Sequence, residues 1–140
     1  TSPALAPWIS HSDDARALPG VRAVFLLAPA IVQAFAPGQL SSLQLPVSIV
    51  LGDADKVAPP TSNGEAAQAL IPGATLLRLA DVGHYDFLST CTAAGVQRLP
   101  DLCTAATSRA GTHRRTVDAA TGFFDAALRE PHDNEPLHLR

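Results

Sequence analysis

Three short runs of apolar and β-branched residues stand out along the first 80 positions. They cover residues 21–27, 46–51 and 74–79, and glycine or proline lies at or beside the ends of each run. Runs of this length without strict alternation of apolar and polar residues are typical of strands buried on both faces, as in parallel sheets. The pattern predicts three strands of a parallel sheet.

Helical spacing appears in two further segments. Ser62 and Glu65 are spaced as in a capping box, in which Ser62 would accept from the N–H of Glu65, and this predicts a short helix over 66–71. Because that helix lies between two predicted strands, the three elements form a βαβ unit. Apolar residues at helical spacing also predict an amphipathic helix from Thr112 to about Arg129 that packs on a sheet: Val117, Ala120, Phe124, Ala127 and Leu128.

The chain of 140 residues has the length of one ordinary domain. We expect an irregular N-terminal segment over 1–20, a folded α/β domain over 21–129 and a polar tail over 130–140. The sequence begins with Thr1 and contains no methionine, so we expect a processed, trimmed or partial chain.

Composition narrows the class of partner. The chain is 46% hydrophobic and 16% charged, which favours a packed core over disorder. Its net charge is -3 and its basic residues are scattered, so we expect no nucleic-acid partner. No apolar run reaches the roughly 18 residues that a membrane helix needs, so we expect no membrane span.

Candidate chemistry lies in two loops, each of which follows a predicted strand. Asp53 and Asp55 follow the run at 46–51, and His84 follows the run at 74–79. Since parallel neighbours place their carboxyl ends on one edge of a sheet, Asp55 and His84 could meet within hydrogen-bond distance. A carboxylate behind a histidine fixes its tautomer and stabilises the imidazolium, as a general base requires.

Each candidate also has a simpler interpretation. Asp53 is the second candidate for the acid, and either aspartate could instead cap a turn. Asp86 fits a local turn or cap better than a second acid. A metal site made of Asp53, Asp55 and His84 is conceivable, but no ligand spacing supports it. We expect the remaining histidines to face solvent: His11, His113, His132 and His138.

The two loops and their strands resemble a known family. The stretch Leu45-Pro-Val-Ser-Ile-Val-Leu-Gly-Asp-Ala-Asp-Lys-Val-Ala-Pro-Pro, followed by Val82-Gly-His-Tyr-Asp-Phe-Leu, is similar to the C-terminal third of α/β-hydrolases. Bacterial predicted dienelactone hydrolases, which also resemble platelet-activating-factor acetylhydrolases, are the most similar. The resemblance runs from about Val21 to Leu128. It implies a serine-type carboxylic ester hydrolase that acts on a small-molecule ester without a cofactor, with Asp55 and His84 as triad acid and base.

Cys91 and Cys103 are the only cysteines. From the residues alone they could be two buried thiols. The family resemblance instead implies a disulfide, which would stabilise the fold by about 3 kcal/mol for a loop of this size. A disulfide would place the protein in an oxidising compartment, such as the periplasm or the cell exterior.

The nucleophile of such an enzyme is missing from the sequence. No serine or cysteine has glycine two positions away on both sides; Ser62 has Gly64 after it but Pro60 before it. We therefore expect this chain alone to be inactive. The alternatives are a non-catalytic binding module or pseudoenzyme, or a hydrolase with a metal or another nucleophile.

The strand predicted at 21–27 indicates which kind of partner the chain would bind. It is apolar on both faces, so an open edge there would tend to pair with another chain. We expect a complementary N-terminal half, self-association through this edge, or a gene fragment that folds poorly.

Overall fold

A computed structural model describes residues 18–129 as a three-stranded parallel sheet with packing helices. The strands are β1 (Val24–Leu27), β2 (Val47–Gly52) and β3 (Thr75–Leu79), in the order β1-β2-β3. In the two ladders Val24 pairs with Val47, and Ser48 pairs with Thr75. The predicted α/β class is confirmed. The predicted irregular segment and polar tail lie almost wholly outside the described residues.

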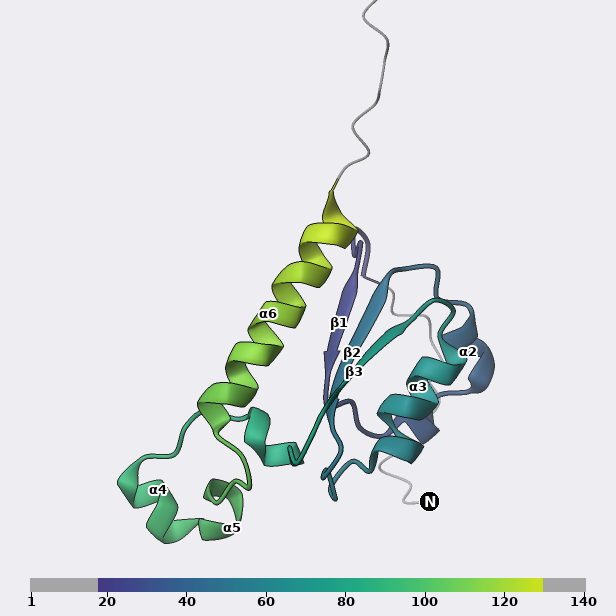
Figure 1. Cartoon of the computed structure of the whole chain (residues 1–140). Helices are drawn as coiled ribbons and strands as arrows, with labels where there is room; N and C mark the ends of the chain where they lie inside the picture. Colours follow the sequence, from purple (N-terminus) through teal and green to yellow (C-terminus); the bar gives the residue numbers. More distant parts are fainter. Residues whose placement is uncertain (1–17, 130–140) are drawn as a thin grey trace, which may run out of the picture.

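Helices connect and follow the strands along the chain (Figure 1). The 3-10 helix η1 and the helix α2 lie between β1 and β2, and α3 lies between β2 and β3, as the βαβ pattern predicts. The bounds are η1 (Val32–Ala34), α2 (Pro37–Ser41), η2 (Pro60–Ser62), α3 (Gly64–Leu70), η3 (His84–Phe87), α4 (Ala93–Arg98), α5 (Pro100–Cys103) and α6 (Arg109–Leu128). None of the described helices is both long and apolar enough to cross a membrane.

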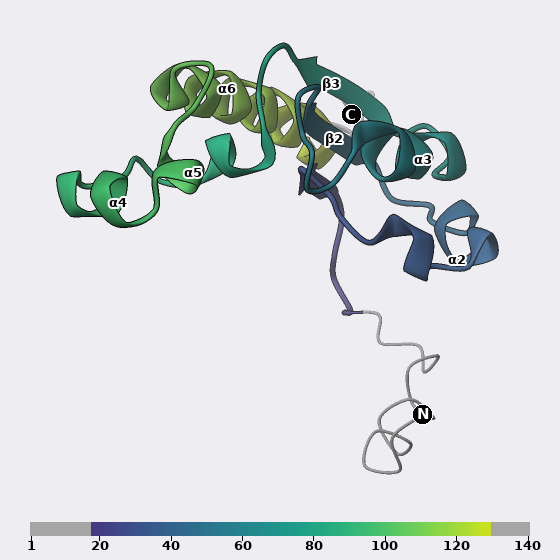
Figure 2. The same cartoon turned by 90° about the horizontal axis from the view of Figure 1, so that it is seen from below.

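The sheet is covered by α3 on one face and by α6 on the other (Figure 2). Side chains of β2 alternate between the two layers, because successive residues of a strand point to opposite faces. Val47 and Ile49 pack with Ala67 of α3, whereas Val50 packs with Leu79 and with Ala119 of α6. Every residue of β2 is buried, as expected for the central strand of a three-layer unit.

The long helix α6 contacts the sheet through a stripe that differs from the predicted one. Phe123 and Phe124 both lie 6.1 Å from the ring of Phe25 on β1. Val117, expected on the packing face, is instead exposed. The half-buried positions of this part of the helix are 116, 119, 120, 123, 124 and 127, and this stripe leaves Val117 and Leu128 on the solvent side.

The start of α3 also differs from the prediction. Ser62 lies in η2, where its hydroxyl donates to the carbonyl of Pro59, so the predicted capping box does not form. Asn63 occupies the N-cap position, and its side chain links segments by accepting from Val32 N and donating to Pro59 O. Asn63 therefore anchors η1, which follows β1, to the start of α3.

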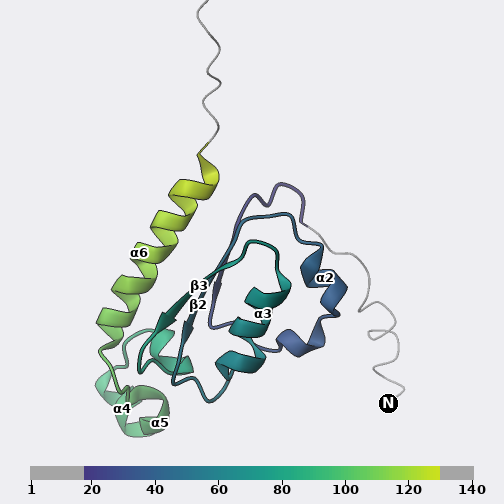
Figure 3. The same ribbon diagram turned by 45° about the vertical axis from the view of Figure 1, so that its right-hand side comes forward.

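The segment between η3 and α6 contains two short helices that no sequence pattern predicted. Two short helices, α4 and α5, lie beyond the N-terminal end of α6 and away from α2 (Figure 3). Cys91 and Cys103 form a disulfide across this segment, with 5.8 Å between their Cα atoms. The disulfide implied by the family resemblance is therefore present, and it closes the α4–α5 segment on itself.

Candidate functional site

Asp55 and His84 meet at the carboxyl edge of the sheet. The Oδ2 atom of Asp55 lies 2.8 Å from Nδ1 of His84, although the residues are 29 positions apart. Asp55 follows β2 and His84 begins η3, just after β3, so the parallel arrangement of the two strands brings them together. Since an ionised carboxylate can only accept, Nδ1 carries the hydrogen and Nε2 is left as the basic nitrogen.

The carboxylate of Asp55 is held on both of its oxygens. Its Oδ1 accepts from the backbone N–H groups of Val57 at 2.9 Å and Ala58 at 2.7 Å. The Asp55 side chain is only 2% exposed, whereas the His84 side chain is 25% exposed. A buried, fully bonded acid therefore supports a histidine that solvent or a ligand can reach.

Backbone contacts hold the two loops at this distance from each other. Ala54 N donates to Val82 O at 3.1 Å, and Asp53 N donates to Leu79 O at 3.1 Å. Gly52 makes the approach close, since a Cβ atom there would lie 2.0 Å from Val82 O. Only glycine fits at this point, so the end of β2 specifies the spacing between the acid and the histidine.

Asp53, the second candidate for the acid, takes a different position. Its Oδ1 accepts from Asp81 N at 2.7 Å rather than facing His84. Asp81 adopts a left-handed backbone with φ of 58°, a conformation that aspartate tolerates better than most residues. Asp53 thus fixes the turn after β3, and of the two aspartates Asp55 is the one that binds the histidine.

Asp86 and His113 also have structural partners. Asp86 is buried, and its Oδ2 accepts from Gly83 N at 2.8 Å, as a local cap would. His113, expected to face solvent, is half-buried, and its Nε2 lies 2.9 Å from Leu88 O. It therefore links α6 to the end of η3. His11, His132 and His138 lie outside the described residues.

An open pocket of about 430 Å³ adjoins His84. Tyr85 packs edge-on against the imidazole, with 5.6 Å between ring centroids, and is partly exposed. Neither Tyr85 nor Lys56, which also lines the pocket, was predicted as a site residue from the sequence. The lining residues are Ala54, Lys56, Val57, Asp81, Gly83, His84, Tyr85, Asp86, Asp101, Thr104 and Ala106.

Three serines at helix ends bond to the backbone of their own helices. The hydroxyls of Ser41 and Ser42 donate to carbonyls within α2, and Ser108 accepts from Gly111 N as the N-cap of α6. Among residues 18–129 no group of three or more histidine, cysteine or carboxylate side chains is placed to hold a metal ion. The chemistry that the described residues offer is that of the Asp55–His84 pair.

Comparison with known proteins gives short or partial likenesses. No protein-family model matches the chain. A stretch of 76 residues, 54% of the chain, is 40% identical to the polyketide synthase ThaQ of Burkholderia thailandensis, and it spans 4% of that synthase.

Several solved structures resemble the chain in part, and they are hydrolases. A predicted CIB-like hydrolase from Thermoplasma acidophilum matches 73% of the chain and 40% of its own length, at 20% identity and a TM-score of 0.47. An α/β-hydrolase from the metagenome of sediments of the Mar Chica lagoon, Morocco, matches 66% of this chain and 32% of its own, at 19% identity and a TM-score of 0.41. Carboxylesterase CesB from Bacillus subtilis matches 63% of this chain and 25% of its own, at 19% identity and a TM-score of 0.37. The chain thus spans less than half the length of these proteins.

Proposed function

We propose that this chain supplies the acid and the general base of a serine-type carboxylic ester hydrolase of the α/β-hydrolase type. One observation carries the proposal: Asp55 holds Nδ1 of His84 at 2.8 Å on the carboxyl edge of a parallel sheet, beside an open pocket. The order of acid and then histidine along the chain is the order found in this class of enzyme.

The chemistry follows from the two ring nitrogens. Nε2 of His84 takes the proton of a serine hydroxyl as the oxygen attacks the ester carbonyl, and later returns a proton to the leaving alcohol. Asp55 stabilises the imidazolium that forms between these steps, and its two backbone donors keep the carboxylate in place. A water then repeats the sequence to release the acid from the serine.

We propose that the nucleophile and the oxyanion hole come from an N-terminal half that joins the sheet at β1. Within the described residues β1 is an edge strand, so in a parallel ladder the backbone groups of Phe25 and Leu27 point away from β2. Alongside it lies an apolar groove of about 440 Å³, here called the β1 groove, which Val24, Leu26, Pro29, Ala30, Val32, Phe35, Leu40, Leu43, Val47, Ala67 and Ile71 line.

A strand that is apolar on both faces fits this edge. It would pair with the free backbone groups of β1, and its neighbouring helix or loop would cover the groove. Strand addition of this kind combines main-chain hydrogen bonds with burial of apolar side chains. The Cys91–Cys103 disulfide further suggests an oxidising compartment, the periplasm or the cell exterior, for the assembled enzyme.

A labelling experiment tests the proposal. The 140-residue chain and the complete product of the gene that encodes it are each treated with a fluorophosphonate probe and assayed with p-nitrophenyl acetate. We expect covalent labelling and hydrolysis only for a product that includes the upstream half. Labelling of a serine within the 140 residues would contradict the missing nucleophile.

Absence of labelling in both preparations would favour the alternative, a binding module without catalysis. Self-association of the chain through β1 would appear as a dimer in analytical ultracentrifugation. A dimer that persists when the upstream half is present would contradict the assignment of that half to the β1 edge.

A further inference from the structure

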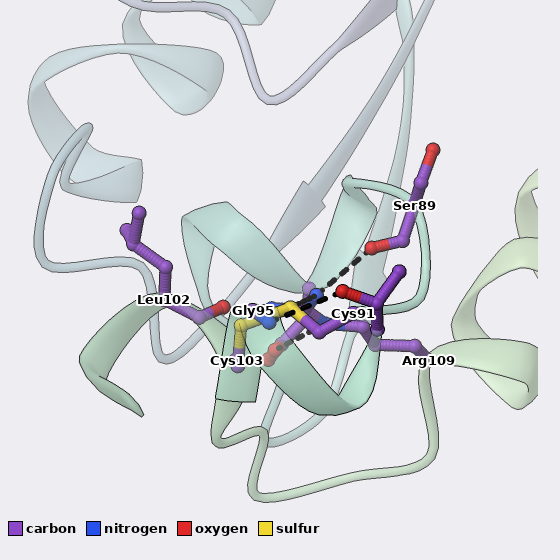
Figure 4. The surroundings of a disulfide bond; sticks show 8 residues. Ser89, Cys91, Gly95, Leu102, Cys103 and Arg109 are labelled. Carbon is purple, nitrogen blue, oxygen red and sulfur yellow. Dashed lines mark hydrogen bonds and ion pairs between the residues drawn. A yellow bond between two sulfur atoms is a disulfide. The ribbon is translucent and has the colours of Figure 1, made fainter. Parts of the chain in front are cut away.

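A buried arginine lies at the first position of α6. The side chain of Arg109 is only 6% exposed, which is unusual for a charged group and requires compensating partners. Its guanidinium donates to the carbonyls of Ser89 and Leu102 and to the sulfur of Cys91 (Figure 4). Cys91 and Leu102 belong to the segment that the disulfide closes, and Ser89 lies two residues before it. Arg109 therefore binds that segment and its entry to α6.

The remaining side of the guanidinium faces the histidine loop. Nε of Arg109 has no hydrogen-bond partner, and it lies 3.9 Å from Oδ1 of Asp86. The side chain of Asp86 is 8% exposed, so two opposite charges are buried beside each other. Each charge compensates part of the desolvation cost of the other, and removing one would leave the other unpaired.

Asp86 in turn holds the backbone that carries the imidazole. Its other oxygen, Oδ2, accepts from Gly83 N at 2.8 Å, directly before His84. A continuous set of contacts therefore runs from the disulfide segment through Arg109 and Asp86 to the residue before His84. Asp55 contacts the ring itself, at Nδ1 of His84.

We propose that Arg109, acting through Asp86, is a positioning residue for His84. Its guanidinium holds the Asp86 carboxylate against Gly83 N. This contact fixes the backbone before His84 and so the position of the imidazole relative to the Asp55 carboxylate. The significance of this positioning for catalysis rests on the proposed function, but its effect on the His84 ring can be measured without any reaction.

The test compares Arg109→Met with Arg114→Met, a matched loss of an exposed positive charge on the same helix. Both variants are made in the 140-residue chain, and the ring nitrogens of His84 are observed by ¹H–¹⁵N NMR. In the parent chain and in Arg114→Met we expect one tautomer, with the hydrogen on Nδ1. In Arg109→Met we expect a mixture of the two tautomers. An unchanged His84 spectrum in Arg109→Met would overturn the proposal.

Arg109→Lys keeps the test decisive if Arg109→Met does not fold. A lysine retains the charge near Asp86 but cannot donate to the Ser89 and Leu102 carbonyls in the same fork geometry. We expect Arg109→Lys to restore part of the Nδ1–H tautomer of His84, so that its population exceeds that in Arg109→Met. If Arg109→Met is unfolded, the comparison is with the parent chain, and we expect less Nδ1–H tautomer in Arg109→Lys. A folded Arg109→Lys with the parent His84 spectrum would show that the guanidinium geometry does not position the ring.

In the complete gene product, Arg109→Lys should lower kcat for p-nitrophenyl acetate by up to about 100-fold, with KM nearly unchanged. A rise in KM with kcat unchanged would contradict a positioning role for Arg109. If the complete product with Arg109 intact shows no labelling, the proposed function fails, whereas the NMR result stands independently.

Discussion

The two sides of the central strand differ in how complete they are. On the β3 side, the loops are joined by backbone hydrogen bonds, and the edge strand carries Arg78, whose guanidinium binds Glu65 of α3. On the β1 side, the edge strand is wholly apolar and lies beside the β1 groove. A charged residue on an edge strand discourages pairing with another chain, and β1 has none.

The backbone shows the same contrast. After β3 the left-handed residue is Asp81, which Asp53 supports with a hydrogen bond. After β1 the left-handed residues are Ala28 and Ile31, with φ of 44° and 61°, and Ile31 is exposed. A β-branched residue in this conformation is strained. The Asp55–His84 pair thus lies on the side of the sheet where the loops are joined, and β1 is the edge at which we propose assembly.

The largest expected effect is a loss of catalytic activity that leaves assembly at β1 unchanged. In the complete gene product, His84→Ala should reduce kcat/KM for p-nitrophenyl acetate by about 10³-fold or more, because the general base is lost. In the 140-residue chain, the same substitution should leave any association through β1 unchanged in sedimentation analysis. His113→Ala, which removes a histidine bound to Leu88 O, serves as the control and should lose less than about tenfold. Activity that survives His84→Ala would refute the site.

The next effect tests the close contact on the β3 side. Gly52→Ala should lower the free energy of unfolding by about 3 kcal/mol, because the new methyl group would meet the Val82 carbonyl. Chemical denaturation of the 140-residue chain measures this, with Gly38→Ala as the control, where a Cβ meets nothing within 4 Å. Equal stability of the two variants would show that the loops are not held by this contact.

A smaller effect compares the two edges directly. Leu27 on β1 and Leu77 on β3 are similarly exposed here, at 41% and 36%. If another strand covers β1 in the complete gene product, Leu27→Lys should destabilise that product by about 2 kcal/mol, and Leu77→Lys should cost well under half of this. Denaturant unfolding of both variants gives the comparison. Equal costs would argue that nothing adds to the β1 edge.

The smallest effect concerns the ion pair that marks the β3 edge. Arg78→Ala should change the free energy of unfolding by about 0.5 kcal/mol, since the arginine is half exposed and solvent screens the pair. The double variant with Glu65→Ala isolates the pairwise contribution in a double-mutant cycle. A coupling free energy well above about 1 kcal/mol would show that this ion pair stabilises the fold, in addition to discouraging the β3 edge from pairing with another chain.

Much of the architecture could be predicted from local pattern. The three strands and the helix between the second and third follow from apolar runs and their glycine and proline boundaries, and Asp55 and His84 follow from strand ends in a parallel sheet. The choice of Asp55 over Asp53 rested on the family resemblance, because both aspartates follow the same strand. The contacts of Ala54 and Asp53 with the β3 loop decide it.

The support behind His84 was not visible in the sequence. Arg109 reads as an ordinary polar residue before a helix, and its burial depends on how the segment from 91 to 103 folds around it. That segment has no apolar period long enough to predict α4 or α5. Burial of a charge by residues distant in the sequence produces no local sequence pattern. The role of Arg109 as the charged partner of Asp86 is therefore visible only in the structure.

The position of Arg109 in the chain affects the order in which the site forms during synthesis. Because translation proceeds from the N-terminus, β2, β3 and the histidine loop leave the ribosome before α6 exists. Until α6 emerges, Asp86 has no guanidinium beside it, so the acid and the imidazole lie in a nascent chain without their second support. A ribosome that stalls before the Arg109 codon would therefore expose a sheet with an unsupported histidine to proteases and chaperones.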